Sequence, residues 1–284
     1  MAPSSPRRPA EARLLQDFGP TALITGASDG IGRACAEQLA AQGFDLILVA
    51  RSRALLDDLA FTLREEHGVH VRVHAPDLTD PEAVTTLLET TDALPIGLVV
   101  AAAGYGSTGR FVDQPLESEL AMIDLNCRAV TALAHRFGQR MQARGRGGIM
   151  LFGSLVGFQG APFSATYAAT KSFVQSLAEG LAVELRPHGV SVLSVAPGPV
   201  GTGFASRAGM TMGKAARPDR VAAAALGALG RQGTVRPGFQ SKALGWSLGM
   251  LPRGMRVLAM GRIMQGMVGK VSKTAGDNIR KSVS

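Results

Sequence analysis

Short runs of consecutive apolar residues alternate along the chain with longer segments in which apolar residues recur every three or four positions. The runs have the length of β-strands, and the longer segments have the period of amphipathic helices. Strands that are apolar throughout are buried on both faces, as in a parallel sheet covered by helices. The expected strands are 22–25, 46–50, 69–73, 98–103, 148–152 and 190–196.

One expected strand has a different pattern, because Val69, Val71 and Val73 alternate with polar residues, which indicates a position near a sheet edge. The helices between the strands are expected at 31–42, 52–67, 80–91, 117–144 and 164–186, and a further one at 219–226. Asp80 and Pro81 are typical of a helix start. The alternation predicts an α/β fold with a doubly wound parallel sheet.

No linker or internal repeat divides the pattern, so we expect a single domain at 19–240. It is expected to follow a disordered lead at 1–18 and to precede a basic, methionine-rich helical tail at 241–284. The lead lacks the apolar stretch of a secretory signal, and no apolar run is long enough to span a bilayer. Cys35 and Cys127 lie far apart, which favours a reducing, cytoplasmic location.

Charge is distributed unevenly within the net +8 of the chain. Up to Thr202 there are 16 Lys and Arg against 20 Asp and Glu, and from Gly203 onward there are 14 against 2. The basic character therefore belongs to the C-terminal part. No helix-turn-helix, zinc or aromatic-basic pattern accompanies it, so we do not expect a nucleic-acid partner.

A glycine-rich loop joins the first expected strand to the first helix. Glycines allow a backbone to turn tightly and approach a pyrophosphate, and the free N–H groups of the following helix bind phosphate. The loop therefore predicts a dinucleotide site. Its expected cofactor contacts are Gly26, Ser28, Asp29, Gly30, Ile31 and Gly32.

Tyr167 and Lys171 are four residues apart in an expected helix, so they share a face. An ammonium near a tyrosine lowers the pKa of the phenol and makes it an acid or base for a carbonyl or alcohol. Ser154 ends the fifth strand, where its hydroxyl can donate to a substrate oxygen. Asn126 is a polar residue in the middle of a long helix. These four residues are the candidate catalytic set.

The loop, Tyr167-Ala-Ala-Thr-Lys171, Ser154, Asn126 and Pro197-Gly198 together resemble the short-chain dehydrogenase/reductase family, over about 20–204 and more loosely to about 239. The resemblance implies a Rossmann-type fold with a seven-stranded parallel sheet in a single domain, and a homodimer or homotetramer. It implies that Lys171 also binds the nicotinamide ribose and that Asn126 holds a proton-relaying water. It further implies nicotinamide contacts from Pro197, Gly198, Val200 and Thr202.

Arg51 directly follows the second expected strand, where the family's NAD-preferring members carry Asp. A guanidinium can hold the extra phosphate of NADP in a forked pair, so we expect NADP(H) to be preferred over NAD(H). The resemblance gives Asp77 and Leu78 the adenine contact. It adds Ala103 and Gly104, although this chain has Ala-Ala-Ala-Gly where the family has Asn-Asn-Ala-Gly.

These features predict an NADPH-dependent oxidoreductase that transfers hydride between the nicotinamide and a ketone or secondary alcohol. Phe204, Met210 and Met212 favour an apolar small-molecule substrate. Two alternatives are a non-catalytic NADP-binding regulatory or scaffold protein and a sugar-nucleotide epimerase. The chain has neither the glycine spacing nor the length of the epimerases. We expect no metal, because no carboxylate pair accompanies the cluster of His67, His70 and His74.

The tail segment 243–268 is apolar but interrupted by arginines, and Pro252 is expected to divide it into two short helices. In the second helix the apolar residues fall near one face. Three roles are open for this face: packing on the domain or a partner, a lid over the substrate, or peripheral contact with an anionic membrane. Its members are Val257, Met260, Ile263, Met264 and Met267.

Overall fold

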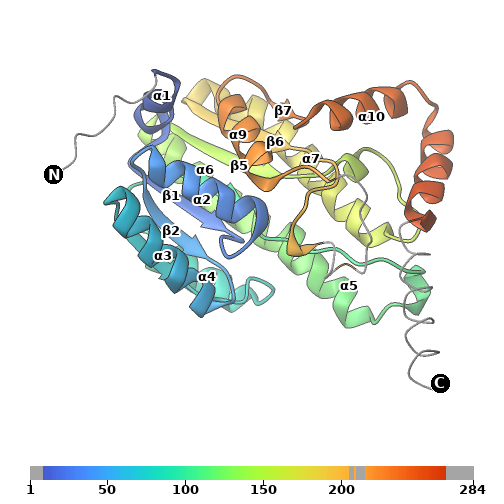
Figure 1. Ribbon diagram of the computed structural model, residues 1–284, viewed down its shortest axis with the longest axis horizontal. Helices are drawn as coiled ribbons and strands as arrows, with labels where there is room; N and C mark the ends of the chain where they lie inside the picture. The colour runs from blue at the N-terminus through green and yellow to red at the C-terminus, as the bar shows by residue number, and fades with distance from the viewer. Residues whose placement is uncertain (1–8, 205–207, 209–214, 267–284) are drawn as a thin grey trace.

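The computed structural model describes residues 9–204, 208 and 215–266. Within them, seven parallel strands form one sheet in the order β3-β2-β1-β4-β5-β6-β7, with helices on both faces (Figure 1). The expected doubly wound, Rossmann-type sheet is confirmed. The strands are β1 (Thr21–Thr25), β2 (Asp45–Val49), β3 (Val71–His74), β4 (Ile96–Ala101), β5 (Gly147–Phe152), β6 (Val190–Val195) and β7 (Thr234–Val235).

The central strands are apolar throughout because each of their faces meets a separate core. Ile24, Leu48 and Val100 pack into one cluster with α2, α3 and α9, and the alternate residues of the same strands pack into the other with α4, α6 and α7. The helices are α2 (Gly30–Ala41), α3 (Arg53–His67), α4 (Pro81–Thr90), α5 (Leu116–Ile123), α6 (Val130–Arg144), α7 (Ala165–Leu185) and α9 (Pro218–Ala228).

Sequence features at two elements are confirmed in detail. β3 lies at the sheet edge, where Val71 is buried and Arg72 is exposed. Asp80 is the N-cap of α4 and its carboxylate accepts a hydrogen bond from the Glu82 N–H at 2.9 Å. The seventh strand, which only the family resemblance implied, pairs with β6 through Thr234 and Val235.

Two segments depart from expectation. Residues 9–18 of the lead that we predicted to be disordered form helix α1 (Pro9–Phe18), because Leu14 and Phe18 lie on one side and are buried against the core. The remainder of the lead lies outside the described residues. The single helix expected at 117–144 contains a π-helical segment, Asp124–Ala129, between α5 and α6.

The tail forms two helices separated at Pro252, as expected: α10 (Phe239–Gly249) and a helix at 253–266. Met260 and Met264 are buried with Leu248 and Ala161 in a small separate cluster. Their face therefore packs on the chain's own domain. Met267 lies outside the described residues. In the part of the chain that the structure describes, no helix has both the length and the apolar character that crossing a membrane requires.

Candidate active site at the carboxyl ends of the strands

The glycine loop that follows β1 lies directly against the end of β4. Gly26 has a φ of 69°, and a Cβ there would lie 2.9 Å from the Ala103 nitrogen. The Thr25 hydroxyl accepts a hydrogen bond from the same nitrogen at 3.0 Å. Gly32 leaves no room for a side chain against the Gly26 carbonyl. The loop is therefore a bare backbone surface, which is the form that a pyrophosphate requires.

The loop also meets the segment that follows β6. A Cβ on Gly30, which has a φ of 58°, would lie 2.7 Å from a Thr202 methyl carbon. Asp29 stands at the N-cap of α2 but makes no side-chain cap hydrogen bond, and its carboxylate instead accepts one from the Gly203 N–H at 3.1 Å. The Asp29 carboxylate therefore does not cap the first backbone N–H groups of α2, and these groups can bind an anion. The candidate phosphate residues and Thr202 form one continuous cradle.

Arg51 and Asp77 meet at the rim of the cradle, 3.8 Å apart. The Thr79 N–H and hydroxyl both donate to one Asp77 oxygen, at 3.0 and 2.9 Å. Although burial acts to raise the pKa of Asp77, these hydrogen bonds and then Arg51 lower it overall. The other Asp77 oxygen faces Arg51, whose side chain is 73% exposed. Both groups are accessible to an adenosine placed beyond the ends of β2 and β3.

Asn126 lies in the π-helical segment, where a residue is added to a helical turn and the side chains are redirected. Its Oδ1 accepts a hydrogen bond from the Tyr105 N–H at 3.2 Å. Its Nδ2 donates to the Tyr105 carbonyl at 2.9 Å and to the Thr170 hydroxyl at 3.0 Å. Asn126 is buried and ties the segment after β4 to α7. These contacts position the residues around Lys171.

Tyr167 and Lys171 lie on the buried face of α7, and Ser154 lies at the end of β5. The Lys171 ammonium is 5.7 Å from the centre of the Tyr167 ring and donates to the Phe152 carbonyl at 2.8 Å. A Cβ on Gly104 would lie 3.4 Å from this ammonium and 2.9 Å from the Asn126 Oδ1. The four candidate catalytic residues therefore converge, with Gly104 leaving space between them.

The pKa of the tyrosine differs from the expected direction. Burial raises the pKa of Tyr167 to about 12, and hydrogen bonding with Ser154 opposes this only in part. Burial also lowers the pKa of Lys171 to about 8. The net pKa of the phenol is therefore raised, and not lowered as the sequence argument predicted, because desolvation outweighs the effects that favour the charged form. At neutral pH the site thus holds a neutral phenol, which is a proton donor.

The turn after β6 is held from two sides. The Pro197 carbonyl accepts from the Leu155 N–H at 3.0 Å, and the Gly198 N–H donates to the Ser241 hydroxyl of α10 at 3.0 Å. Val200 is buried and pairs with Ala216 in an isolated bridge. The candidate nicotinamide contacts are therefore positioned partly by the tail.

Several polar contacts at the site were missed by the sequence reasoning: those of Thr25, Tyr105, Thr170 and Ser241. Thr170 lies within the Tyr167–Lys171 motif, three residues after Tyr167, so helical spacing could have predicted that it is a buried polar residue. Nothing in the sequence signals Ser241, because its partner is 43 positions away.

The remaining sequence features are distributed as follows. Leu78 is buried, Phe204 packs on Tyr167 with ring centres 5.4 Å apart, and Met210 and Met212 lie outside the described residues. Cys127 is half-buried near Lys171, and burial raises the pKa of its thiol. Within the described residues, no three His, Cys, Asp or Glu side chains gather as metal ligands would.

Comparison with known proteins gives the family. The short chain dehydrogenase family model matches residues 20–212. The chain belongs to this family of oxidoreductases, which act on CH–OH and C=O groups with a nicotinamide cofactor.

Two relatives and one solved structure illustrate the similarity. A 7beta-hydroxysteroid dehydrogenase of Clostridium sardiniense is 33% identical over 64% of this chain and 70% of its own length. A very-long-chain 3-oxoacyl-CoA reductase-A of Danio rerio is 32% identical over 82% of this chain and 74% of its own. A short-chain dehydrogenase from Sphingobium yanoikuyae, solved in complex with NADPH, is 38% identical with a TM-score of 0.77, covering 81% of this chain and 92% of that one.

Proposed function

We propose that this protein is an NADPH-dependent oxidoreductase that interconverts an apolar ketone and its secondary alcohol. One observation carries the proposal. The buried Tyr167 phenol is flanked by the Ser154 hydroxyl and the Lys171 ammonium, at the end of the sheet where the glycine loop forms a phosphate cradle.

In this proposal Tyr167 is the acid for carbonyl reduction. Its proton stays bound at neutral pH because its pKa is about 12. The phenolate formed when that proton is donated is stabilised by Lys171, which is mostly protonated at neutral pH because its pKa is about 8. Ser154 donates a hydrogen bond to the same substrate oxygen, where negative charge develops. Asn126 is a positioning residue for Lys171 and for the segment after β4. Its expected water relay remains part of the proposal.

The cofactor part of the proposal rests on the fit of the cradle. Gly26, Gly30, Gly32 and Gly104 leave backbone surfaces that a side chain would fill. When bound, the reduced nicotinamide supplies the hydride. Arg51 is the group we assign to the 2′-phosphate that distinguishes NADPH from NADH. Asp77 is assigned to the adenine amine. The solved relative that contains NADPH supports this preference.

The apolar substrate class is supported by the walls around the Tyr167 ring. Phe204 packs against that ring, and Val156 and Phe163 lie on the segment between Ser154 and Tyr167, partly buried beside the tail. Two relatives are named for a hydroxysteroid and for very-long-chain 3-oxoacyl-CoA, whose steroid and acyl parts are large and apolar. We therefore propose a bulky or long-chain ketone rather than a small polar one.

We further propose that residues 19–240 form the catalytic domain and 241–284 a basic tail, and that the enzyme works in the cytoplasm as a homodimer or homotetramer. Two free cysteines, Cys35 and Cys127, suit a reducing compartment. The contact between Gly198 and Ser241 indicates that the tail contributes to the shape of the site.

The test is an NADPH-consumption assay over ketones of graded chain length and ring size. The proposal predicts turnover that rises with apolar bulk, and preference for NADPH over NADH. Cofactor binding without turnover on any ketone, or on any alcohol with NADP⁺, would instead support a non-catalytic role.

A further inference from the structure

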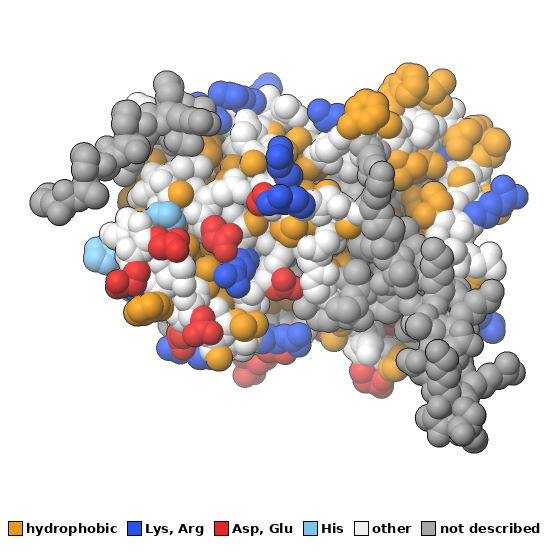
Figure 2. All heavy atoms as spheres, in the orientation of Figure 1, with side chains coloured by type: hydrophobic (Ala, Val, Ile, Leu, Met, Phe, Trp, Pro, Cys, Tyr) orange, Lys and Arg blue, Asp and Glu red, His pale blue; other side chains and the backbone are white. Residues whose placement is uncertain are grey.

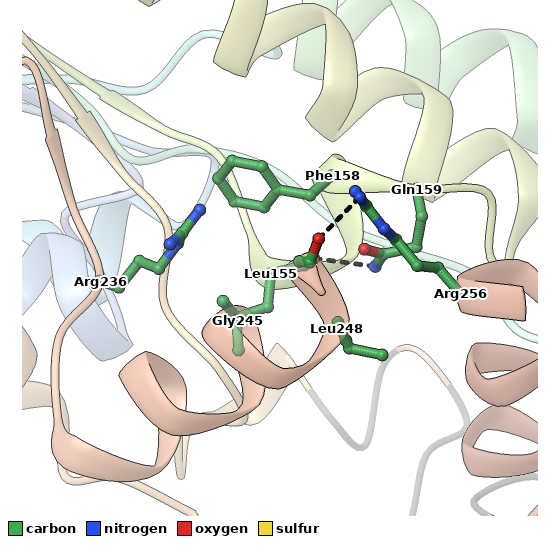
Figure 3. A pocket seen from close by; sticks show the side chains of 8 residues that line it. Leu155, Phe158, Gln159, Arg236, Gly245, Leu248 and Arg256 are labelled. Carbon is green, nitrogen blue, oxygen red and sulfur yellow. Dashed lines mark hydrogen bonds between the residues drawn. The ribbon is translucent and has the colours of Figure 1, made fainter. Parts of the chain in front are cut away.

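The two tail helices have an inner side fixed to the domain. Met260 and Met264 are buried beside Ala161 and Ala168. Just before α10, the Arg236 guanidinium lies 4.4 Å from the centre of the Phe158 ring, and Arg256 of the next helix donates to the Gly249 carbonyl at the end of α10 at 3.0 Å (Figure 3). The tail is thus a firmly seated part of the molecule, and its outer side is presented in a defined orientation.

That outer side is unusually apolar. Its large side chains form one exposed stripe along α10 and one along the next helix, because their spacings of three, four and seven residues place them on a common face. Figure 2 shows these apolar side chains gathered over α10 and the turn that follows it. The exposed fractions are 84% for Phe239, 70% for Trp246, 70% for Met250, 54% for Met255 and 70% for Leu258.

The same region carries only positive charge. Between residues 220 and 266 the sequence contains seven Lys and Arg and no Asp or Glu. Lys242, Arg253 and Arg262 are exposed, and within the described residues none of the three has an ion-pair partner. The apolar stripe is therefore bordered by these three cations. Anionic groups that pair with them would have to come from another molecule.

We propose that this outer face, formed by Phe239, Trp246, Met250, Met255 and Leu258 with Lys242, Arg253 and Arg262, docks on the surface of an anionic lipid bilayer. Apolar side chains beside Lys and Arg suit the headgroup boundary, and an indole is stable there because one end is apolar and the other polar. Each Lys or Arg near an anionic surface adds to the attraction.

The charge pattern disfavours a second copy of the chain as the occupant. A two-fold interface places the same patch on itself. It would bring the group of Lys242, Arg253 and Arg262 close to the same group of the second copy, and residues 220–266 contain no Asp or Glu to neutralise either group. An acidic macromolecule would neutralise the cations but leave the apolar stripe in water. A bilayer with anionic headgroups satisfies both.

Docking would also place the candidate site close to lipid. The helix at 253–266 packs its inner face on the segment that joins Ser154 to Tyr167. Its outer face would then lie in the headgroups about 10 Å away, one helix diameter. An apolar ketone held in the bilayer would thus be concentrated beside the site. This last step rests on the proposed function, whereas the docking itself does not.

The experiment is flotation of the full-length protein with vesicles of phosphatidylcholine containing about one-third phosphatidylglycerol, at low and high salt. The protein is expected to float with these vesicles, and less so at high salt, because exposed charges are screened. Pure phosphatidylcholine vesicles should bind it weakly.

Matched variants assign the binding to this face. The double variant Trp246→Ser/Leu258→Ser should reduce the vesicle-bound fraction roughly tenfold or more, since it removes apolar area from the contact. The control Leu55→Ser/Phe61→Ser changes two exposed apolar residues on α3, at the opposite end of the molecule, and should bind normally. Arg253→Glu should weaken binding, whereas Arg186→Glu, an exposed arginine elsewhere, should do so much less.

Each variant is checked by its thermal midpoint and by NADPH affinity, which exposed substitutions should leave unchanged. The inference is overturned if the wild type ignores anionic vesicles, or if both double variants lose binding equally. It is also overturned if Trp246→Ser/Leu258→Ser changes only the oligomer size in solution, which would show that a second copy covers the face. A variant that loses vesicle binding but still turns over ketone would show that membrane docking and the proposed function are independent of each other.

Discussion

The sheet and the tail use apolar residues in opposite ways. In β1, β2 and β4 every residue but Asp45 is buried, because helices cover both faces of the sheet. α10 is also rich in apolar residues, yet Leu248 is buried while Trp246 on the other side is exposed. A helix that is apolar all round is normally buried. The difference indicates that the sheet completes its packing within the chain, whereas the outer face of the tail needs an outside partner.

The two regions differ equally in charge. The part up to Thr202 is slightly acidic, and the part after it carries nearly all of the excess positive charge. Candidate chemistry is confined to the first region, where Tyr167 and Lys171 are buried. We therefore expect substitutions in the sheet region to affect turnover and those on the outer tail to affect location.

The largest expected effect is that of Tyr167→Phe. The ring still packs but has no proton to donate, so kcat should fall about 10²–10⁴-fold while NADPH affinity stays nearly constant. Initial rates and fluorescence titration measure the two quantities. Trp246→Ser on the outer tail should keep turnover of a soluble ketone within about twofold of the wild-type rate. Equal losses of turnover in the two variants would contradict the contrast between the sheet region and the outer tail.

Next in size is the contrast between the two sides of the tail. Met264→Ala removes a buried side chain and should cost about 2 kcal/mol or more of unfolding free energy, whereas Leu258→Ala, on the exposed side, should change it by less than about 0.5 kcal/mol. Urea denaturation of both variants measures this. Similar losses would mean that Leu258 is covered in solution.

A smaller effect is expected at the cofactor rim. Arg51→Asp removes the cation assigned to the 2′-phosphate and adds an acceptor for a ribose hydroxyl. The ratio of kcat/KM for NADPH to that for NADH should fall roughly tenfold or more, since hydrogen bonds to charged groups contribute about 1.5–3 kcal/mol. Arg53→Asp, two residues later, is the control. An unchanged ratio in Arg51→Asp would place phosphate recognition elsewhere.

A last effect is expected in the pH dependence of stability. Burial lowers the pKa of Lys171 from 10.5 to about 8. Between these values the unfolded chain binds a proton that the folded protein does not, so the contribution of Lys171 to stability rises with pH, by at most about 1.4 kcal/mol per unit. Well below pH 8 Lys171 is protonated in both the folded and the unfolded state, so the full desolvation penalty of the buried ammonium is present.

Lys171→Met should remove this rise. Unfolding free energies of wild type and variant, measured at pH 8, 9 and 10, should therefore differ by an amount that changes with pH. Parallel curves would mean that Lys171 is not desolvated as the structure indicates.

The sheet could be predicted because its strands are continuous apolar runs, which have no other stable environment. The candidate site could be predicted where spacing carries the geometry, as for Tyr167 and Lys171 on one helical face. Helix α1 was missed because its burial depends on Phe18 reaching the distant Gly97 and Gly148. The π-helical turn at Asn126 and the Ser241 contact also depend on distant partners, which local periodicity does not encode.

The raised pKa of Tyr167 was missed for a similar reason. Sequence spacing places Lys171 near the phenol but gives neither its bond to the Phe152 carbonyl nor the extent of burial. The desolvation of the Tyr167 phenol depends on how the folded site packs around it. Only the structure therefore shows whether desolvation or the nearby positive charge has the larger effect on the pKa of Tyr167.

The most direct test of the central claim is transfer of label from NADPH deuterated at the reactive C4 position. A bulky apolar ketone, the wild-type enzyme and the labelled cofactor would be incubated together, and the product alcohol analysed by mass spectrometry. The proposal predicts one deuterium on the carbinol carbon, and with Tyr167→Phe the same labelled alcohol formed about 10²–10⁴-fold more slowly. Binding of NADPH with no label transferred to any ketone in the panel would contradict it.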